Sequence, residues 1–211
     1  MQDAFIKIPK DTLYDPDDMT SYKNLILSYL YFKRDFNNQI TMSMSLMCQE
    51  LNMTFGRQSS SGNQALNFIK LLIQNGTLIL EPRLQCLSPS QISRSNLFVV
   101  TYNPPVSQVT SFVMLTLSEF NTLTSYLLSN EVSQRTDKLL KVYLYIKASL
   151  NTKNPDAALC ISGATIRSLV RVGSSGAQEI LDILEDAELI TSIAPNTYSL
   201  TKVEKPLDKT Q

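Results

Sequence analysis

The sequence contains no histidine, and only three cysteines among its 211 residues. Without histidine, the chain lacks the commonest general base of enzymes and the commonest zinc ligand. Cys48, Cys86 and Cys160 lie far apart and form no CxxC pair, so we interpret them as buried thiols in a reducing compartment. These absences argue against catalysis that depends on a metal or on histidine.

Other catalytic and membrane signatures are also missing. The sequence has no GxGxxG, GxxxxGK[ST] or GxSxG motif. Its densest carboxylates lie in "YDPDD" (residues 14–18) and "QEILDILEDAE" (residues 178–188). A two-metal nuclease uses such groups, but a proline turn and a solvated helix face explain them better. No apolar run is long enough to span a bilayer, and the first residues form no leader. We therefore expect a cytoplasmic protein that is not an enzyme and uses no metal, cofactor or membrane.

The composition that remains is that of an ordinary globular protein, with 43% apolar residues, 18% charged residues and a net charge of zero. The length allows one large domain or two domains of about 100 residues each. Two fragments recur at the same separation of 114 positions. "SSGNQ" (residues 60–64) returns as "SSGAQ" (174–178), and "SYLYFK" (28–33) returns as "VYLYIK" (142–147). The shared separation indicates an internal duplication.

Hydrophobic periodicity gives the two halves the same order of elements. In the first half it predicts, in order, a strand at 5–9, a helix within 19–36, a short strand near Ile40, a short helix at 44–53, a loop, a helix at 63–76 closed by Gly76, and strands at 77–81 and 97–102. In the second half it predicts a strand at 112–116, an extra helix at 117–130, a helix at 136–150, a short strand at 158–162, helices at 163–173 and 174–189, and a hairpin at 190–202. The "NPPVSQ" segment (103–108) between them is a natural domain boundary.

Each half thus contains a strand, a helix, a short strand, a short helix, a turn, a helix and a β-hairpin. This is the order of a winged helix, in which a hairpin follows a helix-turn-helix. We expect a mainly α protein with small β wings (α+β), built from two tandem winged-helix domains at residues 1–104 and 105–211. "SSG" would cap and begin the helix that such domains place in a DNA major groove, close to a phosphate, and "YLY" would belong to the buried helix behind it.

The "FIKIP" start and the helix–helix–helix–wing pattern ending in "NFIKLLIQNGTLIL" resemble the winged-helix modules of plasmid and phage replication initiators and replisome organisers. Two such modules in tandem are similar to plasmid initiators with paired winged helices, and to conjugation and mobile-element regulators. The resemblance covers both halves but rests on generic hydrophobic patterns. It implies DNA binding and does not choose among these roles.

The first domain carries most of the candidate DNA-contacting residues. Residues 51–118 contain a single acid, Glu81, and a polar stripe runs along the 63–76 helix opposite its apolar face. Asparagine and glutamine can pair with adenine, and lysine can reach guanine or phosphate, although any solvated helix face can show such a stripe. The candidates are Arg57, Ser59, Ser60, Ser61, Asn63, Gln64, Asn67 and Lys70, with Arg83 and Arg94 expected to contact phosphate from the wing.

The second domain differs, because its corresponding helix exposes Glu179, Asp182, Glu185 and Asp186, which DNA phosphates would repel. Only the first turn of that helix and the basic segment before it could face DNA. The candidates there are Arg167, Arg171, Ser174, Ser175 and Gln178. The alternative is that this domain holds a partner protein or a second subunit.

The sequence therefore predicts a double-stranded DNA-binding protein that acts in plasmid or phage replication initiation, or in transcription regulation of a mobile element. The rival hypothesis is a replisome or conjugation adaptor whose winged helices bind protein, which the net charge of zero permits. The apolar helix at 120–130 also leaves a homodimer open.

Overall fold

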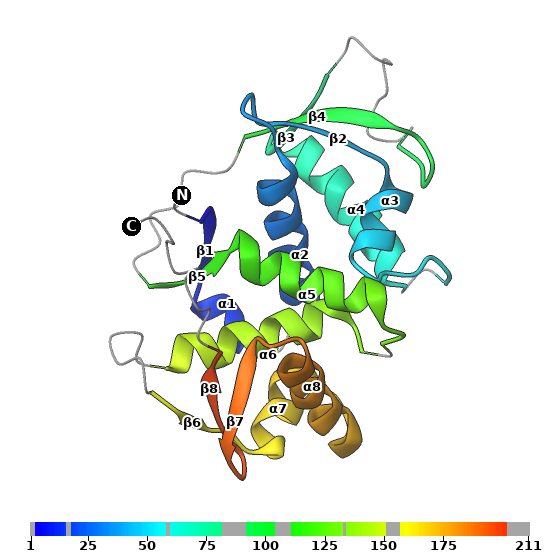
Figure 1. Cartoon of the computed structure of the whole chain (residues 1–211). Coiled ribbons are helices and arrows are strands. Elements are labelled where there is room, and N and C mark those ends of the chain that lie inside the picture. The colour runs from blue at the N-terminus through cyan, green and yellow to red at the C-terminus, as the bar shows by residue number, and fades with distance from the viewer. Residues whose placement is uncertain are drawn as a thin grey trace, which may run out of the picture.

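The computed structural model of the chain describes residues 3–15, 18–57, 60–81, 92–103, 111–132, 134–150 and 157–201. Within these residues the protein is α+β, rich in helices, and its strands form small antiparallel sheets (Figure 1). The boundary expected at residues 104/105 lies outside the described residues, so the division into two domains stays a prediction.

The order of elements expected from the sequence is confirmed in both halves. The first half contains β1 (Phe5–Pro9), α1 (Asp11–Tyr14), α2 (Asp18–Lys33), β2 (Gln39–Met42), α3 (Met44–Glu50), α4 (Ser61–Gln74), β3 (Leu78–Leu80) and β4 (Phe98–Tyr102). The second contains β5 (Phe112–Thr116), α5 (Leu117–Ser129), α6 (Thr136–Ser149), β6 (Leu159–Cys160), α7 (Gly163–Val170), α8 (Ser174–Asp186), β7 (Ile190–Ala194) and β8 (Thr197–Leu200).

Both halves also share one sheet topology. The sheet of the first half has the strand order β2-β4-β3, and that of the second half has β6-β8-β7. β2 and β6, the strands before the last two helices of each half, pair with the final strands β4 and β8. These final strands also pair with β3 and β7, which follow the last helix. The duplication read from two short fragments therefore extends to the whole arrangement of elements.

Local signals explain where several helices begin and end. The Ser43 hydroxyl caps α3 by accepting from the Leu46 amide, and Ser162 caps α7 in the same way. Thr116 and Glu119 form a capping box at the start of α5. Gly76 follows α4 with φ +78°, a left-handed conformation that glycine adopts without steric cost.

The two halves meet through corresponding elements. β1 pairs with β5 in an antiparallel register in which Phe5 faces Thr116 and Pro9 faces Phe112. Since Phe5 and Phe112 each begin their strand, exchanging the two halves leaves this register unchanged, as at the interface of a two-fold symmetric dimer. The corresponding helices α2 and α6 also pack against each other. The halves are thus joined like the two subunits of a dimer.

The repeated "YLY" fragment lies in these two packed helices. Tyr29 in α2 and Tyr143 in α6 are both buried, each with a lysine near its ring, Lys33 at 5.6 Å and Lys147 at 5.9 Å. Each lysine forms an ion pair with a glutamate, Glu50 for Lys33 and Glu119 for Lys147. Burial, and then the neighbouring glutamate, raises the pKa of both tyrosines, which stay neutral. The fragment recurs because both halves use it at their junction.

α6 is the most enclosed helix of the junction, and polar contacts fasten it to the first half. The Arg135 guanidinium binds the Asp137 carboxylate with two hydrogen bonds, of 2.8 and 3.0 Å, and lies 4.4 Å from the centre of the Tyr22 ring. Lys141, only 3% exposed, donates to the backbone oxygen of Asp15. Buried apolar side chains of both halves form one continuous core.

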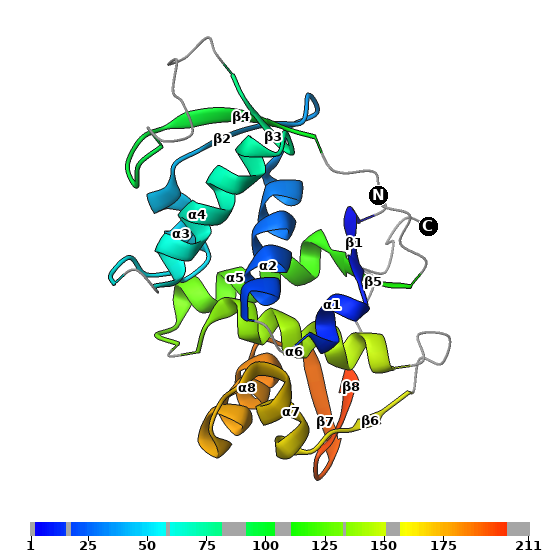
Figure 2. The same cartoon turned by 180° about the vertical axis from the view of Figure 1, so that it is seen from behind.

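α5 lies across the middle of the molecule beside α6 (Figures 1 and 2). The sequence predicted it as an extra helix, but the four-residue α1 occupies the same place after β1 in the first half. Its apolar side chains Phe120, Leu123 and Leu127 are buried within the monomer. Leu128 of the same helix is 56% exposed, and the homodimer suggested from the sequence stays a prediction.

The shared core gives a first testable expectation. If residues 105–109 are replaced by a protease recognition sequence and the chain is cut there, the two fragments should still elute together in size-exclusion chromatography. They should separate only in denaturant, because β1–β5 pairing and α2–α6 packing hold them. Two folded fragments that elute separately without denaturant would contradict the junction described here, and the uncut variant is the control.

Candidate nucleic-acid interface

α4 presents a polar face to solvent and an apolar face to the core. Ala65, Ile69 and Leu72 are buried, as expected from their spacing. Asn67 and Gln74 are exposed, and Lys70 is partly exposed between them. These three side chains are available to a ligand. α4 and α8 both lie on the side of the molecule opposite β1 and β5 (Figure 2).

The serines before α4 do not act as the sequence suggested. Ser60 is the N-cap residue, but its side chain makes no capping hydrogen bond. Instead its hydroxyl accepts from the Gly56 amide at 3.1 Å, and the Ser61 hydroxyl accepts from the Thr54 amide at 3.0 Å. Both hydroxyls therefore bind the preceding loop, because this loop folds back over the start of the helix and supplies nearer donors.

Asn63 has the same inward role. Its amide donates to the backbone oxygens of Gly56 and Arg57, at 3.2 and 2.8 Å. Of the polar stripe predicted along α4, Asn63 thus binds the loop between α3 and α4, whereas Asn67, Lys70 and Gln74 remain on the accessible face. Arg57 is exposed and Gln64 is half-buried. Ser59 and Arg83 lie outside the described residues.

The glycine of "SSG" is closely packed in both halves, and most tightly at Gly62. A Cβ on Gly62 would lie 2.9 Å from Cδ1 of Phe55 and 3.0 Å from the backbone oxygen of Thr54. A Cβ on Gly176 would lie 3.3 Å from Cβ of Val172. Each glycine lets the loop before the helix lie directly against its first turn. This close approach, and not capping by serine, is the physical reason for the repeated fragment.

Arg94, in the segment that leads into β4, is held by its surroundings. Its guanidinium carbon lies 4.6 Å from the centre of the Phe55 ring, and its Nη2 lies 3.4 Å from Oδ1 of Asn63. Its backbone oxygen accepts from the amide and the hydroxyl of Ser45, both at 2.8 Å. The residue expected to contact phosphate thus also connects the segment before β4 with α3, α4 and the loop between those two helices.

In the second half, the candidate residues cluster at the junction of α7 and α8. The Arg167 guanidinium donates to the Ser174 hydroxyl at 2.9 Å, and Gln178 donates to the Asp182 carboxylate at 2.8 Å. Arg171 is exposed, as is Ser175. The N-cap residue of α8 is Gly173, so the serines of this half do not cap the helix either.

The carboxylates of α8 lie on its outer side, as predicted. Asp182, Glu185 and Asp186 are exposed, and Glu179 accepts from Gln134 at 2.7 Å. The basic residues of the segment before α8 are partly used elsewhere: Arg135 and Lys141 contact the first half, and Lys147 pairs with Glu119 of α5. The expectation that the basic segment before α8 faces DNA stays a prediction.

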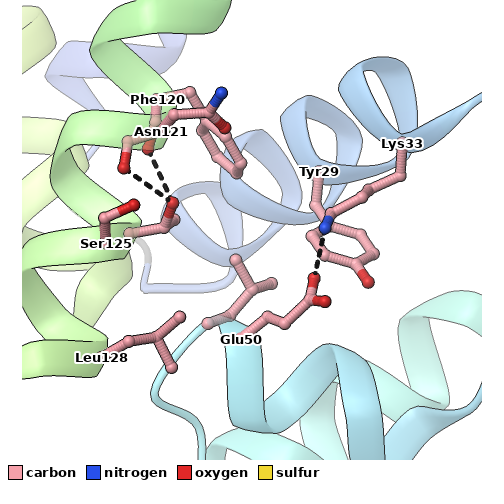
Figure 3. Close-up of a pocket in the computed structure, with 9 residues that line it drawn as sticks. Tyr29, Lys33, Glu50, Phe120, Asn121, Ser125 and Leu128 are labelled. Atoms are coloured by element: carbon pink, nitrogen blue, oxygen red, sulfur yellow. Dashed lines mark hydrogen bonds and ion pairs between the residues drawn. The ribbon is translucent and has the colours of Figure 1, made fainter.

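A pocket of about 180 Å³ lies between the halves, with α5 on one wall and α2 and α3 on the other (Figure 3). The Lys33–Glu50 ion pair, at 2.8 Å, and Tyr29 line the second wall. Asn121 and Ser125 line the first, and the pocket also borders Phe120, Leu51, Thr124 and Leu128. This pocket belongs to the junction and is separate from the exposed face of α4.

The thiols differ from one another. Burial raises the pKa of Cys48 to about 11, so this thiol is protonated, as expected for a buried cysteine. Cys160 is exposed, which corrects the expectation that it is buried, and Cys86 lies outside the described residues. The described part of the chain contains no cluster of three potential metal ligands, and no described helix is long and apolar enough to cross a membrane.

No family model matches the chain, and no curated protein or solved structure matches it significantly. The site therefore has to be interpreted from its own geometry.

Sequence reasoning missed two residues of this surface. Leu71 is 49% exposed on α4, one turn after Asn67, where an apolar side chain interrupts the polar stripe. That interruption could have been recognised in the sequence. Phe55, in the loop between α3 and α4, could not be recognised from the sequence, because its partners Gly62 and Arg94 come from other segments.

The glycine contacts predict a graded effect of alanine substitution on the free energy of unfolding. Gly62→Ala should destabilise the protein by about 1–3 kcal/mol, because its Cβ would overlap the Phe55 ring and a backbone oxygen. Gly176→Ala should cost less, because its nearest contacts are 3.3 Å away. The control, Gly163→Ala, meets no atom within 4 Å and should be neutral or stabilising by up to about 1 kcal/mol. Denaturant unfolding measures all three, and equal effects would contradict the packing role.

Proposed function

We propose that the protein binds double-stranded DNA, that each half is a winged helix, and that α4 enters the major groove. The observation that carries this proposal is the repeated arrangement of three helices with a three-stranded sheet of order β2-β4-β3 and β6-β8-β7. In that arrangement α4 and α8 correspond to the helix that helix-turn-helix proteins insert into DNA.

The exposed face of α4 has the chemistry for reading base edges. Asn67 and Gln74 carry amides that pair bidentately with adenine, and Lys70 between them reaches guanine or phosphate. Leu71 suits contact with a thymine methyl group, which explains an exposed leucine on this face. Because no carboxylate lies among these residues, the face does not repel the phosphates beside the groove.

The second half contributes differently. Its α8 carries four carboxylates, which would be repelled along a DNA groove. Only the α7–α8 junction, with exposed Arg167 and Arg171, is suited to contact phosphates. We therefore assign base reading to the first half and backbone contact to this junction of the second half.

The biological setting rests on the resemblance of the sequence to replication initiators and mobile-element regulators. On that basis we propose a role in replication initiation of a plasmid or phage, or in the control of mobile-element genes. A protein-binding adaptor is the second candidate. The acidic outer side of α8 and the use of three cations inside the molecule favour it, because both reduce the positive charge that DNA requires.

Single substitutions separate the assigned roles. Asn67→Ala should weaken binding to the preferred duplex by about 1–3 kcal/mol through loss of a bidentate contact, and should leave binding to random duplex nearly unchanged. The matched control is Asp182→Ala on α8, which should leave DNA affinity unchanged or slightly higher. Titration of labelled duplexes by fluorescence anisotropy measures both variants. If Asp182→Ala abolished binding while Asn67→Ala had no effect, the roles of the two halves would be reversed.

A further inference from the structure

The segment that leads into β4 is fixed to the helical part of the first half at Arg94. Two hydrogen bonds from Ser45, at the start of α3, hold its backbone oxygen. The neighbouring Ile92 is 2% exposed and anchors the same segment in the core. The position of Arg94 is therefore set by the fold and does not depend on a ligand.

The side chain of Arg94 completes a stack of three segments. Phe55, in the turn, packs directly on Gly62 in the first turn of α4, where even a Cβ would not fit. The guanidinium lies over the ring, 4.6 Å from its centre. The edge of the same guanidinium reaches Oδ1 of Asn63 at 3.4 Å. Phe55 and Arg94 thus hold the first turn of α4 between the loop that precedes it and the segment that leads into β4.

This geometry needs an arginine. A planar guanidinium stacks on an aromatic ring and donates from its edge at the same time, whereas the ammonium of lysine is a point charge without a plane. A phosphate, in contrast, is attracted by either cation. Comparing the wild type with Arg94→Lys therefore distinguishes a positioning role of Arg94 from a simple charge contact with phosphate.

We propose that Arg94 is a positioning residue for sequence discrimination: through Phe55 and Asn63 it fixes the orientation of α4, so that Asn67 and Gln74 meet base edges in register. This inference rests on the proposed function, DNA reading by α4. A binding site works only when its groups are held within a fraction of an ångström and about 10–20°, so loosening this stack weakens specific contacts before it weakens phosphate contacts.

The test compares Arg94→Lys, Arg94→Ala and Phe55→Leu in the full chain. The probes are the duplex that the wild-type protein selects from a random pool and a random-sequence duplex of equal length. Each variant should reduce the ratio of specific to random affinity, by up to about tenfold, through loss of the cation–ring contact, the charged hydrogen bond or both. The slope of log affinity against log salt should stay that of the wild type. The double variant Phe55→Leu/Arg94→Lys should lose no more than either single variant, since both break one stack.

The opposite result is equally clear. If Arg94→Lys keeps wild-type discrimination while Arg94→Ala weakens all sequences alike and lowers the salt slope by about one, Arg94 contacts phosphate and the positioning role is wrong. Thermal unfolding shows whether Phe55→Leu folds, and if it does not, the Arg94→Lys result decides alone. A wild-type protein that binds no duplex would instead overturn the proposed function and this inference with it. Duplex binding with an unaffected Arg94→Lys variant overturns only the inference.

Discussion

The junction of the two halves constrains everything else in this structure. β1 and β5 pair in a register that is unchanged when the halves are exchanged, and the corresponding helices α2 and α6 pack beside them. Burial of Tyr29 and Tyr143, each beside a lysine–glutamate ion pair, makes this junction part of the core. Since the halves share that core, the positions of α4 and α8 relative to each other are fixed by folding.

The same junction explains why two halves of one topology differ in surface chemistry. Arg135 and Lys141 contact the first half and Lys147 pairs with Glu119, so these three cations do not offset the acidic outer side of α8. The first half keeps an exposed polar face on α4, which the Phe55–Arg94 stack holds in place. A duplicated fold can in this way divide its work, with one half reading a ligand and the other half supporting it.

Local and long-range features differed in how far the sequence revealed them. The order of elements followed from hydrophobic periodicity, because burial of one face sets the period of helices and strands. The pairing of β1 with β5 could not be inferred, since contacts between residues more than 100 positions apart leave no local pattern. The serines before α4 looked like caps, yet they bind the preceding loop, which only the folded turn brings near. Leu71 was visible as an interruption of the polar stripe, whereas the role of Phe55 was not.

The central claim is that the first half reads double-stranded DNA through α4. The most direct measurement is the selection of duplexes from a random pool by the intact protein, followed by titration of the enriched duplex over a range of salt. We expect an enriched sequence and an affinity that falls steeply with salt, as phosphate contacts require. We also expect Asn67→Ala to reduce this preference. No enrichment, together with no duplex binding at low salt, would contradict the account and favour the protein-binding adaptor.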